Sequence, residues 1–551
     1  MSRYVLLPLI LFGILIPLTT FAGWTPVGPN VQVTDAGLGR YGDAKKPALA
    51  IQGGSLYAAW LDTRGGSITP NIYFARSDDG GASWSANTLV NLLDFNGSVE
   101  RPVISVASDG SIWIAWWMKR CFASRGACNG RDRYNDTMLA LSTNGGQSFE
   151  QYIILDGDDR STINGYPEIA ATNERTLLLT YDLRGDGVDV LLRIITRAGP
   201  GRLSASTVKV SEGTGNGRIH DPGALGNGPR MALAMHGNTV CAAWEDRRAR
   251  FAIFGACSTD GGQTFGPNIQ ISESDAVNPR LAFGPDGTLY AAYQRKEGKE
   301  IILRRSRDNG ATWGDPNSAF ALAQSQEIWS YDLDASPGGL VLLTFVTGIS
   351  SGSNSDLFLA TSLDGGRSFA LGSRLEDDQG RYPSIATQHR PNTVVGAGPA
   401  GTRAFVIWGD DRNTRWQIWS TRVDLDESAP AAPPNLTAQS GDTSILLTWE
   451  PATDLNGIVG YHVLRATNRD GPYTRITPRL VTATFYRDIG LDAQPYFYRV
   501  YAVDGTGNAG LPSDVATAAA MVGTDLQQLS GVIAYEVEGA GLQCAALLAA
   551  V

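Results

Sequence analysis

Short apolar runs separated by turns rich in Gly, Pro, Asn and Asp recur along most of the chain, a pattern typical of β-strands. Seven of these runs open in a similar way, in most cases at a proline, and they begin at Lys46, Arg101, Tyr166, Gly228, Asn278, Ser330 and Tyr382. A second apolar strand, a third strand, a glycine-rich turn and usually a fourth strand follow each run. The repeat therefore predicts an all-β fold in which each unit supplies one four-stranded blade of a seven-bladed β-propeller.

Five of the turns share the pattern Ser-x-Asp-x-Gly-x-Ser/Thr-Trp/Phe, with Asn replacing Asp once, and begin at Ser77, Ser142, Ser258, Ser306 and Ser362. In such a turn the glycines supply positive φ, the carboxylate or amide accepts backbone N–H groups, and the aromatic ring covers the turn. We therefore expect a structural role, rather than ligand contact, for the third residue of each turn: Asp79, Asn144, Asp260, Asp308 and Asp364.

Two units depart from the repeat, and one departure indicates how the ring closes. The third unit carries RIITRAGPG from Arg193 in place of the turn, and the seventh stops before its fourth strand. The segment GPNVQVTD from Gly28 resembles GPNIQIS from Gly266, the fourth strand of the fourth unit. We therefore predict that the N-terminal strand completes the last blade, which leaves no exposed sheet edge between the first and last blades.

A second domain follows a Pro/Ala-rich linker that begins after Asp424. Its pattern resembles fibronectin type III domains through SILLTWEP with Trp449, GYHVLR with Tyr461, and PYFYRVYAVD with Tyr496. Tyr496 falls at the position of that family's tyrosine corner. The resemblance implies a C-terminal β-sandwich.

The N-terminus has the features of a secretory signal peptide. Arg3 precedes an apolar run at 5–18, and the small residues Thr20 and Ala22 suit a signal peptidase. The run is shorter than the roughly 20 residues that a membrane-spanning helix needs. We expect no transmembrane span beyond this peptide and a secreted or cell-surface location, extracellular or periplasmic, in a bacterium. The predicted segments are the signal peptide (1–22), the propeller (24–425), the linker (426–432), the fibronectin type III-like domain (433–520) and a tail (521–551).

The net charge of −10 and the absence of a cationic cluster exclude the basic footprint that nucleic acid binding requires. Five cysteines in an exported chain permit two disulfides. Cys121 with Cys128 closes a short loop, and Cys241 with Cys257 would join adjacent strands, which leaves Cys544 over. No cofactor is expected; calcium remains open in the acidic turn of Asp156, Asp158 and Asp159, for which a solvated turn is the alternative.

The residues that flank the opening prolines are expected to converge on the centre of the ring, on the face opposite the five turns. Arginine and lysine can hold a carboxylate there, and tyrosine can stack on a sugar. The alternative is that these charges pair with one another across blades. The candidate ligand-binding residues are Lys45, Lys46, Arg101, Tyr166, Arg230, Arg280 and Tyr382, and the candidate catalytic residues are Glu168, Tyr331 and Asp332.

Three strands end in Trp-x-Asp-x-Arg, with the tryptophans at Trp60, Trp244 and Trp408. Recurrence in separate blades indicates a device for packing and salt bridging rather than one active site. The second unit breaks the pattern at Met118 and then inserts a loop, residues 121–136, which is the candidate rim element for ligand contact.

The five turns are Asp boxes, and the first unit resembles the first blade of bacterial exo-α-sialidases, which belong to the Asp-box (BNR-repeat) propellers. The resemblance implies three arginines that clamp the sialic acid carboxylate, a Tyr paired with a Glu as nucleophile, and an Asp as acid/base. The first clamp arginine falls on Lys45 and the acid/base on Thr69. Lys lacks the planar fork of Arg, and Thr cannot protonate a leaving group. The family has six blades, so a six-bladed ring is the alternative architecture.

The sequence thus predicts a sialidase-like propeller that binds an extracellular glycan or other surface polymer through its central pocket, without the full sialidase catalytic set. One alternative is a glycoside hydrolase of the exo-α-sialidase type that uses Glu168 or Asp332 as its acid. The other is a surface scaffold for protein–protein interaction, because a fold does not by itself determine a function.

Overall fold

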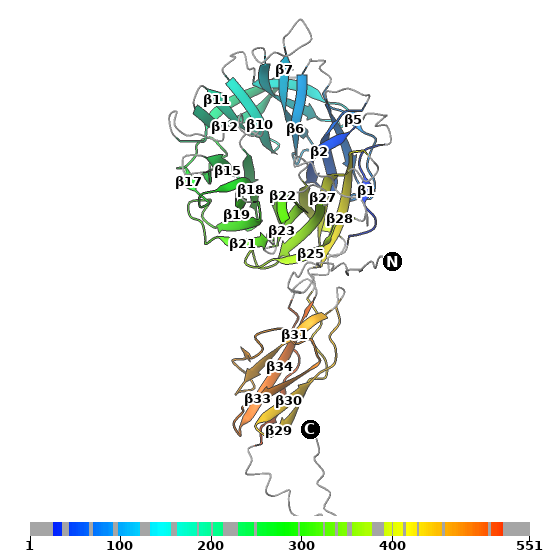
Figure 1. Cartoon of the computed structure of the whole chain (residues 1–551), viewed down its shortest axis with the longest axis vertical. Helices are drawn as coiled ribbons and strands as arrows, with labels where there is room; N and C mark the ends of the chain where they lie inside the picture. Colours follow the sequence, from blue (N-terminus) through cyan, green and yellow to red (C-terminus); the bar gives the residue numbers. More distant parts are fainter. Residues whose placement is uncertain are drawn as a thin grey trace, which may run out of the picture. The chain divides into compact units, whose positions relative to one another are not determined.

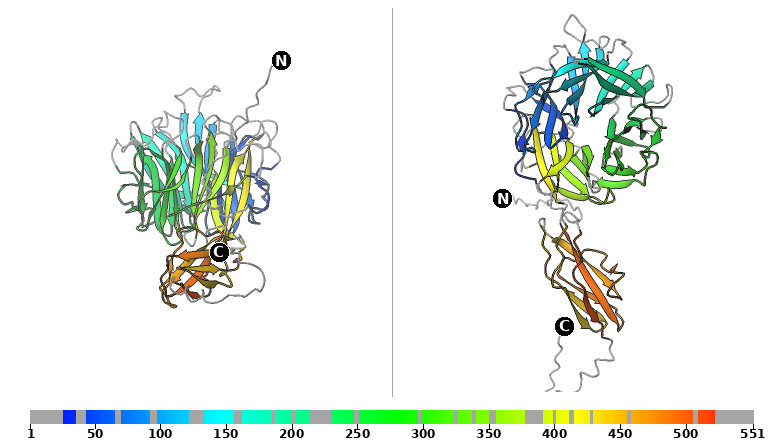
Figure 2. Two further views of the ribbon diagram at one scale, coloured as in Figure 1. Left: turned by 60° about the horizontal axis from the view of Figure 1, so that its bottom comes forward. Right: turned by 180° about the vertical axis from the view of Figure 1, so that it is seen from behind.

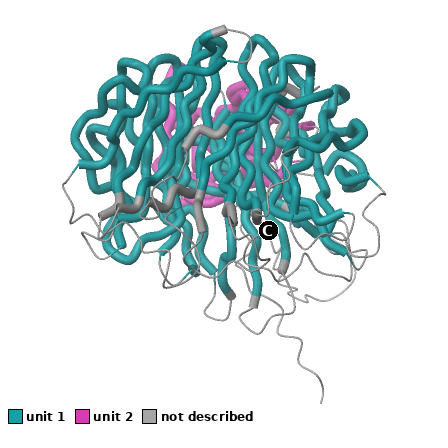
Figure 3. Tube along the Cα trace, turned by 90° about the horizontal axis from the view of Figure 1, so that it is seen from above, with its two compact units in different colours: residues 1–428, 505–507 teal, residues 429–504, 508–551 magenta. Residues whose placement is uncertain are grey.

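The computed structural model describes residues 26–35, 43–64, 70–91, 97–121, 133–155, 162–184, 187–199, 202–212, 230–246, 251–295, 298–322, 326–336, 340–349, 355–376, 391–398, 401–410, 415–426, 429–454, 458–504 and 509–521. The chain divides into two compact units, which Figure 3 colours separately. Unit 1 comprises Met1–Ser428 with Gly505–Gly507, and unit 2 comprises Ala429–Asp504 with Asn508–Val551. Across these described ranges both units consist of strands and turns, and no helix there is long and apolar enough to cross a membrane.

Unit 1 is a β-propeller whose antiparallel sheets stand around a common centre (Figures 1 and 2). Its described strands pair into seven groups of four, numbered here along the chain and given from the innermost strand outward. Group 1 is β2 (Ala44–Gln52), β3 (Ser55–Asp62), β4 (Asn71–Ser77) and β5 (Thr88–Leu89). Group 2 is β6 (Gly97–Val106), β7 (Ile112–Cys121), β8 (Arg133–Ser142) and β9 (Glu150–Leu155). Group 3 is β10 (Thr162–Ala171), β11 (Thr176–Arg184), β12 (Gly187–Gly199) and β13 (Arg202–Lys209).

The remaining groups follow the same order. Group 4 is β14 (Met231–His236), β15 (Thr239–Asp246), β16 (Ala252–Ser258) and β17 (Ile269–Gln270). Group 5 is β18 (Ala276–Phe283), β19 (Leu289–Arg295), β20 (Glu300–Ser306) and β21 (Asn317–Ala321). Group 6 is β22 (Gln326–Ala335), β23 (Val341–Ile349), β24 (Ser355–Ser362) and β25 (Ala370–Arg374). Group 7 is β26 (Asn392–Gly398), β27 (Gly401–Asp410), β28 (Gln417–Asp426) and β1 (Val31–Gln32).

The N-terminal strand closes the ring. β1 pairs antiparallel with β28, with Val31 opposite Ser420 and Gln32 opposite Trp419. This pairing confirms the prediction that the segment from Gly28 supplies the outermost strand of the last sheet. Groups 2 and 3 are also joined into one sheet, because β10 and β8 pair in parallel at a single position.

The innermost strand of group 7 differs from the one that the sequence predicts. β26 holds this position, and the run from Tyr382 lies outside the described residues. Asn392, which directly follows Pro391, pairs with Ile407 on β27. In group 1 the residue that directly follows Pro47 pairs with the second strand at the equivalent position. The prediction that Tyr382 opens the seventh unit is therefore wrong. Two proline-containing runs follow one another here, and the second one pairs with β27.

The Asp boxes are hairpin turns closed by side chains. In the first box, Ser77 Oγ donates to Asp79 Oδ1 at 2.8 Å, and the same oxygen accepts the N–H groups of Ala82 and Ser83 at 2.9 Å each. Partial burial opposes ionisation, but these hydrogen bonds prevail and lower the pKa of Asp79 to about 2. The same Ser-to-Asp/Asn hydrogen bond recurs in the other boxes at Ser142, Ser258, Ser306 and Ser362. Each of these carboxylates or amides is thus bonded within its own turn.

The glycine at the fifth position of each Asp box lies against the preceding group. A Cβ atom at Gly262 would stand 2.6 Å from Leu192 Cδ2 on β12, and one at Gly310 would stand 2.6 Å from Cys257 Sγ on β16. The same approach joins Gly146 to Phe74, Gly366 to Leu303 and, less closely, Gly81 to Phe405. Only glycine leaves room for this contact, so the boxes fasten neighbouring groups as well as turning the chain.

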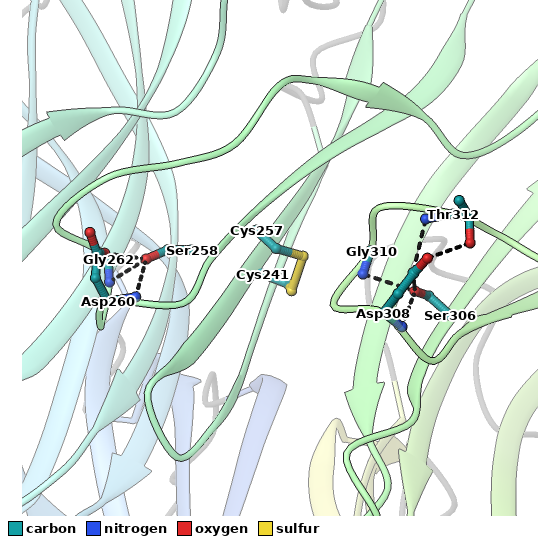
Figure 4. Close-up of a disulfide and its surroundings, with 9 residues drawn as sticks. All are labelled: Cys241, Cys257, Ser258, Asp260, Gly262, Ser306, Asp308, Gly310 and Thr312. Carbon is teal, nitrogen blue, oxygen red and sulfur yellow. Dashed lines mark hydrogen bonds between the residues drawn. A yellow bond between two sulfur atoms is a disulfide. The ribbon is translucent and has the colours of Figure 1, made fainter.

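The predicted disulfide between Cys241 and Cys257 is present, at paired positions of β15 and β16. Figure 4 shows it between the Asp boxes of groups 4 and 5. It packs with Leu289 in a small apolar cluster at the boundary between these groups. The pairing of Cys121 with Cys128 stays a prediction, because Cys128 lies outside the described residues.

Group 3 lacks an Asp box and contacts group 2 differently. Arg197 on β12 donates to Ser111 Oγ, stands 3.8 Å from Asp109 Oδ2, and places its guanidinium carbon 5.5 Å from the Trp113 ring centroid. A polar and cation–π contact therefore takes the place of the glycine contact at this boundary.

Unit 2 is a β-sandwich of two antiparallel sheets. One contains β29 (Thr437–Gly441), β30 (Ser444–Thr448) and β33 (Phe485–Ile489), and the other contains β32 (Thr474–Arg475), β31 (Ile458–Ala466), β34 (Pro495–Asp504) and β35 (Ala516–Ala519). Their inner faces share one apolar core, in which Trp449 packs edge-on against Tyr461 with ring centroids 5.3 Å apart. Tyr496 is buried, and its hydroxyl accepts a hydrogen bond from the Gln494 amide at 2.9 Å.

The variant Gly310→Ala is expected to destabilise unit 1 more than Gly287→Ala. Both glycines lie in turns of group 5 with φ of +79°, so an added Cβ carries similar backbone strain. At Gly310 the Cβ also meets Cys257 Sγ, whereas at Gly287 nothing lies within 4 Å. Overpacking of this kind costs about 1–3 kcal/mol, and urea unfolding of both variants should show that difference. Equal losses of stability would contradict the fastening role of the box.

Candidate functional site

Three residues that open inner strands have left-handed backbone conformations. Lys46, Arg101 and Asn278 have φ of +55°, +48° and +60°, and each directly precedes a proline. At each of them the register with the second strand shifts, as it does at a β-bulge. A bulge redirects side chains, and a non-glycine residue in this conformation costs roughly 1–3 kcal/mol. The repeated strain marks the centre of the ring as a candidate site.

Arg230, just before β14, has two further guanidinium groups as neighbours. Burial lowers the pKa of Arg230; Glu245 opposes this shift, and the positive charges of Arg101 and Arg280 add to it. The three arginines belong to groups 2, 4 and 5, and the charges of Arg101 and Arg280 both act on Arg230. Three predicted ligand-binding residues are thus electrostatically coupled, and we call them the arginine cluster.

Glu245 is the acidic neighbour of the arginine cluster, and the sequence analysis missed it. Glu245 is 4% exposed, and its Oε1 accepts the backbone N–H of Asn278 at 2.7 Å. It stands between the Trp and the Asp of one Trp-x-Asp motif, where the other copies have Leu61 and Gly409. A charged residue at a position that is otherwise apolar or glycine is the signal that could have revealed it.

Asp332, a candidate acid, is held by three hydrogen bonds. Its Oδ1 accepts Arg280 Nε at 3.1 Å, while its Oδ2 accepts the backbone N–H of Thr393 at 2.9 Å and the Asn392 amide at 3.1 Å. Two of these donors belong to β26, so Asp332 joins the inner strands of groups 6 and 7. This arrangement is that of a structural carboxylate.

Tyr331 lies beside the arginine cluster with its side chain buried. The guanidinium carbon of Arg280 stands 5.8 Å from its ring centroid, and Tyr331 acts electrostatically on Arg230. The residue is 2% exposed, and its hydroxyl donates to the carbonyl oxygen of Asn278. A nucleophile must reach its substrate, whereas this hydroxyl is occupied in joining two inner strands.

Both candidate lysines have acidic partners. Lys46 forms an ion pair with Glu100 of the neighbouring group. Lys45 Nζ stands 3.2 Å from Asp43 Oδ2 and 5.1 Å from a ring centroid of Trp416. Lys46 therefore pairs with a charge of the neighbouring group, as the alternative interpretation expects. Lys45 lies beside Trp416, which directly precedes β28 of group 7.

The other candidates are described in part or not at all. Glu168 is half-buried on β10, directly after the bulge of that strand. The side chains of Tyr166 and Cys121 lie outside the description, as do the residues Thr69, Cys128, Asp156, Asp158, Asp159 and Tyr382. Within the described ranges, no group of three His, Cys, Asp or Glu side chains could hold a metal ion.

The Trp-x-Asp motifs are three copies of one packing unit. The indole Nε1 of Trp60, Trp244 and Trp408 donates in each case to the Asp carboxylate two residues on, at 3.1 Å. The three tryptophans are buried. In group 2, where Met118 replaces the Asp, Trp116 Nε1 has no partner among the residues that the structure describes. These geometries support the structural interpretation of the motif.

Side chains of one group also cap the inner strand of the next. These contacts run from Ser105 Oγ to the N–H of Ala171 (3.0 Å), from Gln294 Nε2 to the Ile328 carbonyl (2.7 Å), from Asp334 Oδ2 to the N–H of Val395 (2.9 Å), and from Asn392 Oδ1 to the N–H of Leu49 (2.6 Å). Glu245 Oε1 accepts the backbone N–H of Asn278 in the same way. Polar residues at the centre therefore close the ring as well as line it.

Comparisons with known proteins show local sequence similarity and resemblance in fold. No protein-family model matches the chain. The amylopullulanase of Thermoanaerobacterium saccharolyticum is 31% identical over 83 residues, which is 15% of this chain, and the chain spans 6% of that protein's length. A Hadza microbial sialidase is 14% identical with a TM-score of 0.41, covering 71% of this chain and 68% of the sialidase. An Fn3-like protein from Clostridium thermocellum is 35% identical with a TM-score of 0.15, covering 17% of this chain and 96% of that protein.

The stability of unit 1 is expected to fall as pH rises from about 4 to about 7, in part through Asp334. Burial raises the pKa of Asp334 to about 7, and the neighbouring charge of Asp332 adds to this shift, against hydrogen bonds from two backbone N–H groups. Between its unfolded and folded pKa values the folded state keeps a proton that the unfolded state has released, so rising pH favours unfolding. One such group changes the free energy of unfolding by up to about 1.4 kcal/mol per pH unit.

The variant Asp334→Asn should flatten this pH dependence because it removes the titrating group. Urea unfolding at about pH 4.5 and about pH 7.5 would measure it, with Asp78→Asn as a matched control at an exposed carboxylate. If Asp334→Asn keeps the same stability difference between the two pH values as the unaltered protein, Asp334 does not titrate as described.

Proposed function

We propose that the centre of unit 1 binds a glycan that carries carboxylate groups. The observation that carries this proposal is the arginine cluster, in which Arg230 is half-buried beside the charges of Arg101 and Arg280. Burial and the charges of Arg101 and Arg280 disfavour the charged form of Arg230, whereas Glu245 favours it, and an anion bound beside Arg230 would favour it further. Guanidinium groups bind a carboxylate through two parallel hydrogen bonds, which favours acidic over neutral sugars.

Three further considerations support a glycan as the ligand. The net charge of −10 disfavours nucleic acid, the other common polyanion. The Asp boxes resemble those of sialidases, which recognise a sugar carboxylate through arginine. The strained positions of Lys46, Arg101 and Asn278 recur in separate sheets, which suits a ligand that contacts several strands at once.

We propose further that the protein acts outside the cytoplasm. The predicted signal peptide and the Cys241–Cys257 disulfide both suit an oxidising compartment. We interpret the seven groups of unit 1 as the blades of a seven-bladed propeller. Unit 2, with sheets of three and four strands, is interpreted as a fibronectin type III-like spacer or second contact.

Hydrolysis of the bound glycan is the second candidate. The observation in its favour is that Tyr331 and Glu245 both act on Arg230, since a Tyr–Glu pair beside an arginine clamp is the sialidase arrangement. Binding takes precedence because the Tyr331 hydroxyl is bonded to the Asn278 carbonyl. Release of the fluorophore from fluorogenic sialosides, lost in Tyr331→Phe or Glu245→Gln, would establish hydrolysis instead.

Replacement of Arg230 by alanine should weaken binding to carboxylate-bearing oligosaccharides at least about tenfold, since a charge-assisted hydrogen bond contributes roughly 1.5–3 kcal/mol. A glycan array of sialylated, uronic-acid and neutral oligosaccharides would identify the ligand, and titration calorimetry would measure its affinity. Arg76→Ala is the control and should leave the affinity unchanged. Arg76 lies on β4, is partly exposed and pairs with Asp78. Binding that ignores the carboxylate, or equal effects of the two variants, would refute the proposal.

A further inference from the structure

The outermost strand of group 3 is longer than the outermost strands of the other groups. β13 has 8 residues, whereas β1, β5 and β17 have 2 residues each, β21 and β25 have 5 each, and β9 has 6. Within the described sheets β13 pairs with β12 alone. Its other edge is therefore a row of backbone groups directed away from the sheet.

This edge carries few of the features that usually prevent pairing with another strand. Six of the eight residues of β13 are exposed, and the strand contains no proline. Its charged residues stand at the ends, Arg202 at one and Lys209 at the other, where Lys209 pairs with Asp189 at 2.8 Å. Natural edge strands are normally short, charged or interrupted, so a long edge strand of mostly small residues is suited to strand addition.

The register of β13 shows which backbone groups face outward. Val210 N–H donates to the Val190 carbonyl at 2.9 Å, just beyond the end of β13. Because hydrogen-bonded and non-hydrogen-bonded pairs alternate in an antiparallel ladder, Ser204, Ser206 and Val208 bond to β12. Leu203, Ala205 and Thr207 therefore direct their N–H and C=O groups to the open edge.

We propose that β13 pairs antiparallel with β13 of a second copy of this chain, with Ala205 on the twofold axis. In this register Leu203 of one copy faces Thr207 of the other, so the outward-facing residues meet one another and form about six backbone hydrogen bonds. The smallest side chain lies at the axis. Arg202 stands opposite Val208 rather than opposite Lys209, which avoids a like-charge pair across the interface.

Such a dimer has only this strand pair to hold it, and it is therefore reversible. About six backbone hydrogen bonds, set against the entropy lost on association, give a weak dimer with a dissociation constant of at least tens of micromolar. The pairing would present two ring centres from one assembly, which raises the effective affinity for a polymer that carries repeated ligands.

Sedimentation velocity of the full chain tests the proposal over a range of concentrations from about ten to several hundred micromolar. Ala205→Pro removes an outward N–H and should raise the dissociation constant at least about tenfold, because both copies lose a bond at the axis. Its thermal unfolding should stay close to that of the unaltered protein. Ser206→Pro is the matched control, since it removes an N–H that bonds to β12 and should lower the unfolding temperature.

Hydrogen exchange gives an independent readout. The amides of Leu203, Ala205 and Thr207 should become protected as the concentration rises, while those of Ser204 and Ser206 are protected at all concentrations. A chain that stays monomeric throughout, or a dimer that Ala205→Pro leaves intact, overturns the proposal. Both results are independent of whether the arginine cluster binds a glycan.

Discussion

The innermost strand of each sheet is the constraint on which this propeller depends. It pairs on one side only, except that β10 also pairs with β8 at one position, and yet it faces the centre of the ring. Unpaired backbone groups at such a position must find partners. Ser105, Glu245, Asp334 and Asn392 each accept an N–H from the inner strand of the following group. The arginine cluster lies on or directly before the same strands, so ring closure and the proposed ligand binding share one layer of polar side chains.

The Asp boxes make a second set of contacts between neighbouring groups. The glycines of the Asp boxes let a turn approach the preceding group within ordinary packing distance, and no side chain fits there. Group 3 shows what happens when the box is lost. Arg197 supplies a polar contact with group 2, and the pairing of β12 with β13 continues as far as Gly199 and Arg202. The group without a box therefore has the longest outermost strand among the described groups.

The repeat made most of the fold predictable from sequence. Three features can be recognised from the local sequence alone: the Asp boxes, the N-terminal strand and the Cys241–Cys257 pair. The innermost strand of group 7 could not be recognised in this way, because Tyr382 and Pro391 begin similar runs and only the register with β27 distinguishes them. Propensity and spacing give the kind of element, while the partner strand decides which of two similar runs is used.

The site was predictable in its residue types and less so in its contacts. Arg101, Arg230 and Arg280 were expected at the centre because they flank the opening prolines, and the charges of Arg101 and Arg280 do act on Arg230. Lys46 directly precedes its proline, as Arg101 does, yet it forms an ion pair with Glu100. Which partner each charge finds within the protein depends on side-chain directions at the bulges, and sequence spacing does not encode them.

A structure of the protein with a bound acidic oligosaccharide would test the central claim most directly. If the arginine cluster is the binding site, a sugar carboxylate oxygen will lie about 2.7–2.9 Å from a guanidinium nitrogen of Arg230. A sugar bound at the Asp-box turns or on unit 2, with no anion near Arg230, would contradict it.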